Sequence, residues 1–334
     1  MRIGLLGATG LVGRTMLKLL EDASWVGTDP VLMSSARSAG TLVPFRGHDL
    51  ACVEVSAQQL AGLDILLCSA GGGPSRLWAP VARDLGAWVV DNSSAWRMDA
   101  AVPLVVPEIN GDLVSVLAAG HGGGIIANPN CSTIQVAMAV APLDRLLGVR
   151  EAHVTTLQAV SGGGQAAVAA LIAEEKGEQP TFGVFPRSIR RNVLPAIGAA
   201  LADGSYEEEH KVVVELRKIL GRGEDLAVSC TATRVPVVTG HSAAVRLVCE
   251  KPFDAAAAHA ALDGFPGVVA QAGPHEFSTA LEVAGQCEVH VGRLRPDPSN
   301  PRALLCWVVA DNLLKGAAWN AVQIAAILAG ERSA

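Results

Sequence analysis

The sequence predicts an α/β protein with an N-terminal parallel sheet, followed by a second α+β domain that carries a mixed sheet. Three observations predict this arrangement. Short apolar runs alternate with helix-like segments in the first half, a glycine-rich turn directly follows the first run, and longer strand-like runs fill the second half. Continuous apolar strands separated by helices are typical of a parallel sheet covered on both faces.

The first half contains five apolar runs that we expect to be strands, with helix-like segments between them. Several of these runs end in Gly, Ser or Asn, and ligand sites in parallel sheets lie beyond the carboxyl ends of the strands. The expected strands are 2–7, 29–36, 64–70, 87–94 and 124–130, and the clearest expected helices are 12–22 and 74–86.

The second half has a different pattern. Long β-like stretches at 151–162, 225–251 and 302–312 are separated by helix-like segments at 207–220 and 253–264. The tail, 312–330, is typical of a closing amphipathic or buried helix. We therefore expect a dinucleotide-type domain at 1–127, completed by the helix at 312–331, and a second domain at 128–311.

Composition narrows the class of protein. The chain has 334 residues, a formal charge of −6 and 17% charged residues, without a long basic block, so nucleic acid is not an expected partner. No apolar run reaches the length of a membrane span, and the N-terminus reaches a glycine turn too early for a signal peptide.

The seven cysteines are scattered and form no CxxC pair, which predicts neither a disulfide framework nor a metal site. A reducing cytoplasm is therefore the expected location. Most of these cysteines lie in apolar runs, where a small buried side chain is the ordinary interpretation. Cys131 differs because its neighbours are Asn, Pro, Ser and Thr.

The stretch GATGLVG places Gly7, Gly10 and Gly13 between the first strand and the first helix. Glycines there let backbone N–H groups approach a pyrophosphate at the helix N-terminus, as in a Rossmann-type domain. The spacing is G-x-x-G-x-x-G, and a purely structural turn is the alternative.

The end of the second expected strand distinguishes between cofactors. NAD-binding units usually carry an acid there, whereas this chain has Ser35, Arg37 and Ser38. Hydroxyls and a guanidinium suit a 2′-phosphate, which favours NADP. The alternative is that Arg37 is simply a solvated loop residue.

The stretch IIANPNCSTIQ places Cys131 at the start of a helix-like segment. A helix N-terminus and a nearby imidazolium lower the pKa of a thiol, and backbone N–H groups there stabilise an oxyanion. Asn130 adds an amide donor beside the reacting carbonyl. Alone, this pattern also fits a small core residue at a corner.

Downstream residues supply partners for a nucleophile. Arg234 and His241 lie seven residues apart on a strand–turn–strand segment, and Gln158 precedes a glycine-rich loop. His241 is a candidate general acid/base, although a histidine in a turn is more often merely exposed.

Taken together, these residues resemble the aspartate-semialdehyde dehydrogenase family over nearly the whole chain. The segments that carry the resemblance occur in the family's order: GATGLVG, SSARSAG, VVPEIN, ANPNCSTIQ, QAVSGGG, EEEHKVVVELRKIL, RVPVVTGHS and DNLLKGAAWNAVQIA. The resemblance implies an NADPH-dependent reductive dephosphorylation of L-aspartyl-4-phosphate to L-aspartate-4-semialdehyde through a thioester, in the biosynthesis of lysine, threonine, methionine and isoleucine. It also implies a homodimer or homotetramer.

The resemblance also implies roles for individual residues. Cys131 would be the nucleophile, His241 the general acid/base, and Gln158 would orient the acyl group. The substrate would be bound by Arg97, Asn130, Glu208, Lys211 and Arg234. The cofactor would be bound by Gly7, Thr9, Gly10, Leu11, Val12, Gly13, Ser35, Arg37, Ser38, Gly72, Ser161, Gly162 and Asn312.

Three features depart from the family's usual pattern: His210, Leu216 and the basic run Arg187–Arg191. The alternatives are an N-acetyl-glutamyl-phosphate reductase, whose relatives tend toward an Asn-Pro-Gly-Cys turn, a malonyl-CoA reductase, or a non-catalytic paralogue. An acidic partner for a free ammonium, such as Glu208, would be wasted on an acetylated amine.

Overall fold

The computed structural model describes residues 1–120, 122–179 and 183–331. The chain divides into two compact units. The first runs from Met1 to Pro129 and includes the C-terminal residues from Ala317 onward, and the second runs from Asn130 to Gly316. The domain bounds expected from the sequence, 127/128 and 311/312, differ from these by a few residues.

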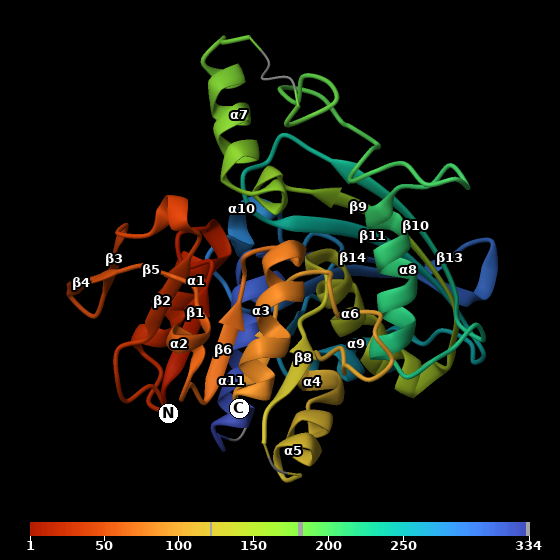
Figure 1. Ribbon diagram of the computed structural model, residues 1–334. Coiled ribbons are helices and arrows are strands. Elements are labelled where there is room, and N and C mark those ends of the chain that lie inside the picture. The colour runs from red at the N-terminus through yellow and green to blue at the C-terminus, as the bar shows by residue number, and fades with distance from the viewer. Residues whose placement is uncertain (121, 180–182, 332–334) are drawn as a thin grey trace. The chain divides into compact units, whose positions relative to one another are not determined.

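The first unit is built on a six-stranded sheet in the order β5-β2-β1-β6-β7-β8, and every pair in it is parallel (Figure 1). This sheet confirms the expected parallel α/β class. Its strands are β1 (Ile3–Leu6), β2 (Val31–Ser34), β5 (Val53–Glu54), β6 (Ile65–Cys68), β7 (Trp88–Asp91) and β8 (Gly124–Ala127). A separate antiparallel pair joins β3 (Leu42–Phe45) to β4 (His48–Ala51).

Helices cover both faces of this sheet because alternate strand residues point to opposite sides. Ile65 and Leu67 of β6 belong to the apolar core shared with helices α1 and α11. The Cys68 thiol, on the other face, meets Ser75 of α3. The helices of this unit are α1 (Leu11–Glu21), α2 (Ala57–Leu60), α3 (Gly72–Asp84), α4 (Pro107–Asn110), α5 (Asp112–Ala118) and α11 (Trp319–Leu328).

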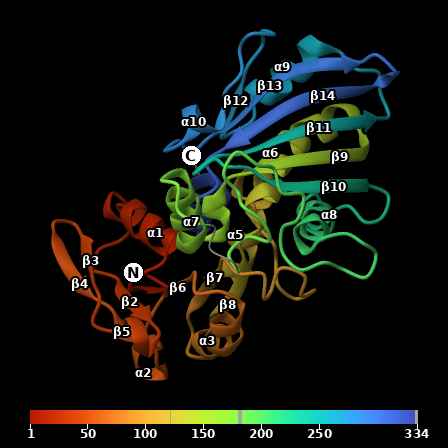
Figure 2. The ribbon, with the colours of Figure 1, turned by 90° about the horizontal axis from the view of Figure 1, so that it is seen from above.

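The second unit contains a mixed six-stranded sheet in the order β10-β9-β11-β14-β13-β12 (Figure 2). The β9–β10 and β12–β13 pairs are parallel, and the other three are antiparallel. The strands are β9 (Val149–Gln158), β10 (Ala227–Arg234), β11 (His241–Cys249), β12 (Val268–Ala270), β13 (Val289–Asp297) and β14 (Asn300–Ala310).

Helices α6, α8 and α9 pack against this sheet, and α6 contacts both of the others. The three helices therefore lie on one face, which is the α+β arrangement that the sequence predicts. The helices of this unit are α6 (Cys131–Leu147), α7 (Gln165–Glu175), α8 (Glu207–Ile219), α9 (Ala255–Asp263) and α10 (Ala280–Val283).

The tail differs from the single helix expected at 312–330. It begins as a π-helix at Leu314–Ala318, and α11 follows. The Asp311 carboxylate accepts hydrogen bonds from the N–H groups of Leu313 and Leu314, at 2.8 and 3.2 Å, and the Asp311 carbonyl accepts one from Gly316 at 3.2 Å. This last bond spans five residues, so it widens the turn.

All seven cysteines are free thiols. In the described part of the chain, no helix combines the length and the hydropathy needed to cross a membrane.

Candidate active site

Cys131 is the first residue of helix α6 and is half-buried. Asn130 caps this helix: its Oδ1 accepts hydrogen bonds from the N–H groups of Ser132 and Thr133, at 3.0 and 3.2 Å. A polar N-cap satisfies N–H groups that have no partner within the helix. The thiol therefore sits at the positive end of a buried, seventeen-residue helix.

Helix α8 holds this corner from a distant part of the sequence. The N–H of Asn130 donates to Glu215 at 2.6 Å, and its side-chain amide donates to Glu208 at 2.8 Å. The Asn130 amide, which we expected beside the reacting carbonyl, thus already donates to the Glu208 carboxylate. Glu215 is 1% exposed and was missed, because one acid among several on a helix gives no signal in the sequence.

Glu208 is buried, and Lys211, one helical turn later, donates to it at 3.3 Å. Burial raises the pKa of this carboxyl group. The charge of Lys211 and hydrogen bonds from Asn130, Gln158 and Lys211 outweigh burial and hold the pKa below its usual value. Glu208 therefore stays negative in the interior, with Asn130, Gln158 and Lys211 around its carboxylate.

His241, the first residue of β11, is fully buried. Its Nδ1 accepts a hydrogen bond from the N–H of Ala159 at 3.0 Å, and its Nε2 has no partner among the described residues. Burial and the charge of Arg234 lower the pKa of His241 well below its ordinary value. The ring is thus neutral, and because Nδ1 is an acceptor, the proton lies on Nε2. The imidazolium expected beside the thiol is not favoured here.

Arg234 ends β10, and its NH1 donates to the carbonyl of Ala159 at 2.8 Å. Burial lowers the pKa of its guanidinium, while the negative charges of Cys131 and Glu208 oppose that shift. A Cβ on Gly162 would lie 3.0 Å from both Arg234 NH1 and His241 Nε2. Gly162, which the sequence analysis assigned to the cofactor, therefore keeps open the space between these two groups.

Ser161 and Asn312, two further residues expected to bind the cofactor, bond to each other. The Asn312 amide donates to the Ser161 hydroxyl at 2.9 Å, and its oxygen accepts from the N–H of Gly240 at 2.9 Å. Both side chains are buried. These bonds fix Gly240, and so the start of the strand that carries His241.

Gly316 contributes to the site although sequence reasoning missed it. A Cβ at this position would lie 3.0 Å from the Cβ of Cys131. The π-helix at Leu314–Ala318 thus passes so close to the nucleophile that only glycine fits without displacing it. In the sequence, the only signal of this widened turn is a glycine inside a helix-like segment.

The first unit contains a cavity of about 560 Å³ at the carboxyl ends of its strands. Predicted cofactor residues that line it are Gly7, Thr9, Gly10, Ser35, Arg37 and Ser38. Gly7 has φ +93°, and a Cβ on Gly13 would lie 2.2 Å from the Gly7 carbonyl oxygen, so these glycines are required by the turn itself. Leu11, Val12, Gly13 and Gly72 are not among the lining residues.

Two lining residues were not predicted from the sequence. Trp78 of α3 presents an indole to the cavity, and Glu54, at the end of β5, contributes a carboxylate. No acid follows β2 in the sequence. However, β5 pairs with β2, and this pairing places Glu54, from a later segment, beside the end of β2.

Arg97 also lies in the first unit and is buried. Its guanidinium donates to the carbonyls of Asn128 and Asn92, at 2.9 and 3.1 Å. Of the residues that depart from the family pattern, His210 is exposed on α8, Leu216 is buried, and Arg187, Arg190 and Arg191 are exposed.

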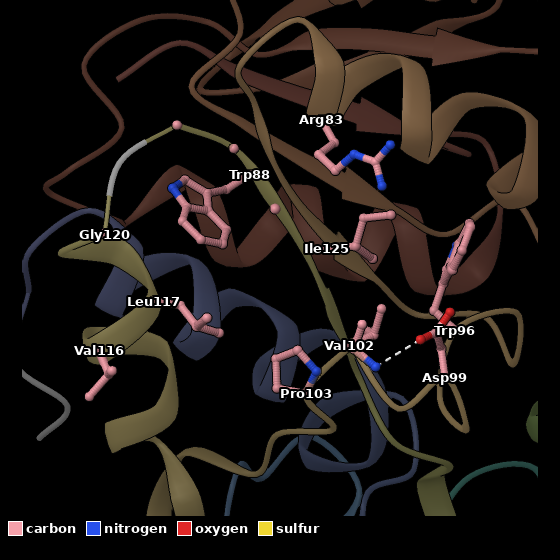
Figure 3. A pocket seen from close by; sticks show the side chains of 14 residues that line it. Arg83, Trp88, Trp96, Asp99, Val102, Pro103, Val116, Leu117, Gly120 and Ile125 are labelled. Atoms are coloured by element: carbon pink, nitrogen blue, oxygen red, sulfur yellow. Dashed lines mark hydrogen bonds between the residues drawn. The ribbon is translucent and has the colours of Figure 1, made fainter.

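A second hollow in the first unit, about 440 Å³, contains none of the predicted site residues (Figure 3). Trp88, Pro103 and Ile125 are among the residues of its walls. At its edge, Arg83 pairs with Asp84, and the Trp96 indole donates to Ser75. We assign it no part in the chemistry of the site.

Comparison with known proteins places this geometry in a family. A model described as "Semialdehyde dehydrogenase, NAD binding domain" matches residues 2–116, and one described as "Semialdehyde dehydrogenase, dimerisation domain" matches 140–315. The aspartate-semialdehyde dehydrogenase of Aquifex aeolicus is 42% identical over 99% of this chain and 98% of its own. The chain belongs to the aspartate-semialdehyde dehydrogenase family.

Other members of the aspartate-semialdehyde dehydrogenase family agree in sequence and in fold. The Bacillus subtilis protein is 40% identical over 97% of this chain and 96% of its own. The crystal structure of aspartate semialdehyde dehydrogenase II from Vibrio cholerae, complexed with ASA, has a TM-score of 0.92 at 36% identity and covers 99% of each chain.

Proposed function

We propose that this protein catalyses the NADPH-dependent reduction of L-aspartyl-4-phosphate to L-aspartate-4-semialdehyde and phosphate. The observation that carries the proposal is the charge arrangement around Cys131. Arg234 interacts electrostatically with both Cys131 and Glu208, so a nucleophile, a cation and a buried anion lie within one cluster. A small α-amino acid with an activated side-chain carboxyl group requires these three partners. The family membership supports the same conclusion.

The guanidinium of Arg234 binds the substrate α-carboxylate. Its planar, forked donors suit a carboxylate better than an ammonium group does. Glu208 binds the α-ammonium. Arg97 and Lys211 neutralise the phosphate group, and Gln158 orients the acyl group. Asn130 fixes the turn through which Cys131 meets the carbonyl.

The Cys131 thiolate attacks the acyl-phosphate carbon. A C–S bond forms, the C–O bond to phosphate breaks, and phosphate leaves with the electron pair. NADPH, when bound, supplies the hydride that reduces the resulting thioester. The C–S bond of the thiohemiacetal then breaks, the thiolate of Cys131 is restored, and the aldehyde leaves.

His241 serves these steps as a hydrogen-bond donor through Nε2–H. The N–H of Ala159 occupies Nδ1, so the neutral ring offers a proton and no lone pair to the substrate oxygen. This donor stabilises the oxyanion that forms when the thiolate attacks and again when the thioester is reduced. To act as a base, His241 would first have to lose the bond to Ala159.

The cavity in the first unit supports the assignment of NADP. Glycine backbone at the mouth of α1 suits a pyrophosphate, Trp78 offers a ring surface to an adenine, and Ser35, Arg37 and Ser38 suit a 2′-phosphate. We propose that residues 1–127 and 312–331 act as the cofactor domain and 128–311 as the catalytic and dimerisation domain.

We also propose that the protein is a homodimer and acts in the cytoplasm. The open face of the second unit's sheet exposes Thr155, Thr231 and Ala244 on adjacent strands. Small exposed side chains on a sheet face suit packing against a second copy. Free cysteines are ordinary in a reducing compartment.

The test is an NADP+ reduction assay with aspartate semialdehyde and phosphate, run beside N-acetyl-glutamate semialdehyde and malonate semialdehyde with CoA. We expect activity on aspartate semialdehyde, and a loss of at least about 10³-fold in Cys131→Ser. Cys287→Ser, at another half-buried thiol, is the matched control and should keep full activity.

Binding of 2′,5′-ADP should be unchanged in both variants, since neither cysteine lines the cofactor cavity. Full turnover by Cys131→Ser would refute the mechanism. Activity on only one of the other semialdehydes would change the substrate, and activity on none with intact nucleotide binding would indicate a non-catalytic paralogue.

A further inference from the structure

The cofactor cavity is lined by a carboxylate, from Glu54, as well as by the guanidinium of Arg37. Glu54 lies at the carboxyl end of β5, paired with Ser34 at the end of β2. The N–H of Val55 donates to the carbonyl of Ser34 at 3.1 Å, which fixes the two strand ends side by side. Both ends line the cavity.

The arginine comes from the turn that follows β2. The 3₁₀ turn Ala36–Ser38 contacts β5, and both Arg37 and Glu54 line the same cavity with exposed side chains. Among the described residues, no ion pair joins them or commits either charge to another partner. Two opposite charges thus face the position where a Rossmann-type unit holds the adenosine ribose.

Arg37 and Glu54 favour different ribose substituents. A 2′-phosphate carries close to two negative charges, so it is attracted by the guanidinium and repelled by the carboxylate. A 2′-hydroxyl donates a hydrogen bond to a carboxylate, which is how NAD-binding units recognise it. The site is therefore not built for the phosphate alone.

We propose that Glu54 is a specificity-determining residue that weakens the preference for NADP and lets the protein also bind NAD. This inference rests on the proposed nicotinamide cofactor and adds the residue that sets its selectivity. Because Glu54 is exposed, its influence is partly screened by salt, and so is the attraction of Arg37 for the phosphate.

The test measures binding of two fragments, 2′,5′-ADP and 5′-ADP, by isothermal titration calorimetry, without any turnover. In Glu54→Gln we expect the Kd for 2′,5′-ADP to fall about two- to fivefold, the size of one exposed charge interaction. The Kd for 5′-ADP should stay constant or rise. The KM values for NADP+ and NAD+ should shift in the same directions.

Two variants serve as controls. Asp49→Asn removes an exposed carboxylate of the same unit that does not line the cavity, so it reports the effect of net charge alone. Arg37→Gln should weaken 2′,5′-ADP binding and leave 5′-ADP nearly unchanged. The proposal fails if Glu54→Gln leaves the ratio of the two Kd values unchanged, or if it weakens 2′,5′-ADP, which would mean that Glu54 only positions Arg37.

Failure of the proposed function would look different. If the wild-type protein binds neither fragment, the cofactor assignment itself is wrong. If it binds both but oxidises no semialdehyde, the substrate assignment is wrong. The calorimetry still tests the effect of Glu54 on nucleotide selectivity in that case.

Discussion

At the scale of single residues, the backbone N–H of Ala159 decides which proton His241 carries. A hydrogen bond at Nδ1 leaves the proton of the neutral ring on Nε2. Complete burial and the charge of Arg234 then keep the ring from gaining a second proton. One main-chain contact therefore sets which ring nitrogen of His241 carries the proton.

This environment predicts how stability depends on pH. The unfolded His241 gains a proton below about pH 6.5, whereas the folded ring, with its lowered pKa, does not. The unfolded state then binds more protons, so folding stability is complete above pH 6.5 and falls below it, by at most about 1.4 kcal/mol for each pH unit.

His241→Asn should remove this dependence and keep an acceptor for the N–H of Ala159. Urea unfolding at pH 7.5 and pH 5.5 measures the effect: the variant's free energy of unfolding should improve relative to wild type at the lower pH. An equal loss in both proteins would mean that His241 is protonated in the folded state.

At the scale of elements, the site is an assembly of helix and strand ends. Cys131 begins α6, Arg234 ends β10 and His241 begins β11, and the chain makes these ends meet because β10 and β11 both pair with β9. Ends of elements carry function because their backbone groups are not all used internally. The rest of each element supplies rigidity.

The π-helix before α11 is part of this assembly. Gly316→Ala would place a methyl carbon 3.0 Å from the Cβ of Cys131, so the nucleophile must shift by a few tenths of an ångström. We expect kcat to fall about tenfold, because small displacements of reacting groups are costly. Binding of 2′,5′-ADP should not change.

Gly223→Ala is the matched control, because a Cβ there meets only an Asp225 oxygen at 3.8 Å. Steady-state kinetics of both variants distinguish crowding at the thiol from a general effect of added side chains. Unchanged kcat in Gly316→Ala would show that the π-helix can move away without consequence.

At the scale of the whole molecule, the second unit exposes one face of its sheet where strands β9, β10 and β11 lie side by side. Helices α6, α8 and α9 cover one face, and Thr155, Thr231 and Ala244 are exposed on neighbouring strands. The family model that matches this unit is described as a dimerisation domain. A sheet face with small side chains suits an interface between two identical copies.

Thr155→Arg should therefore weaken the proposed homodimer, because it would place an unpaired charge in the proposed interface. Size-exclusion chromatography with light scattering should show a lower mass than wild type at the same concentration. Ala260→Arg, at an exposed position on α9, is the control and should leave the mass unchanged. A wild-type mass in Thr155→Arg would place the interface elsewhere.

The sequence by itself determined the fold class and the family. Apolar periodicity predicts the parallel and mixed sheets because burial of strand faces is a local property of the chain. The ordered motifs around Gly7, Cys131 and His241 indicate the family because turn and helix-start chemistry is local too.

Only the tertiary structure decided which groups lie beside each polar or charged side chain of the site. Asn130 bonds to Glu208 and Glu215, more than seventy residues away, and Glu54 reaches the cofactor cavity only because β5 pairs with β2. The proton on His241 follows from a contact with Ala159 that strand pairing creates. Electrostatics and hydrogen bonding depend on distance in space, and separation along the chain does not give that distance.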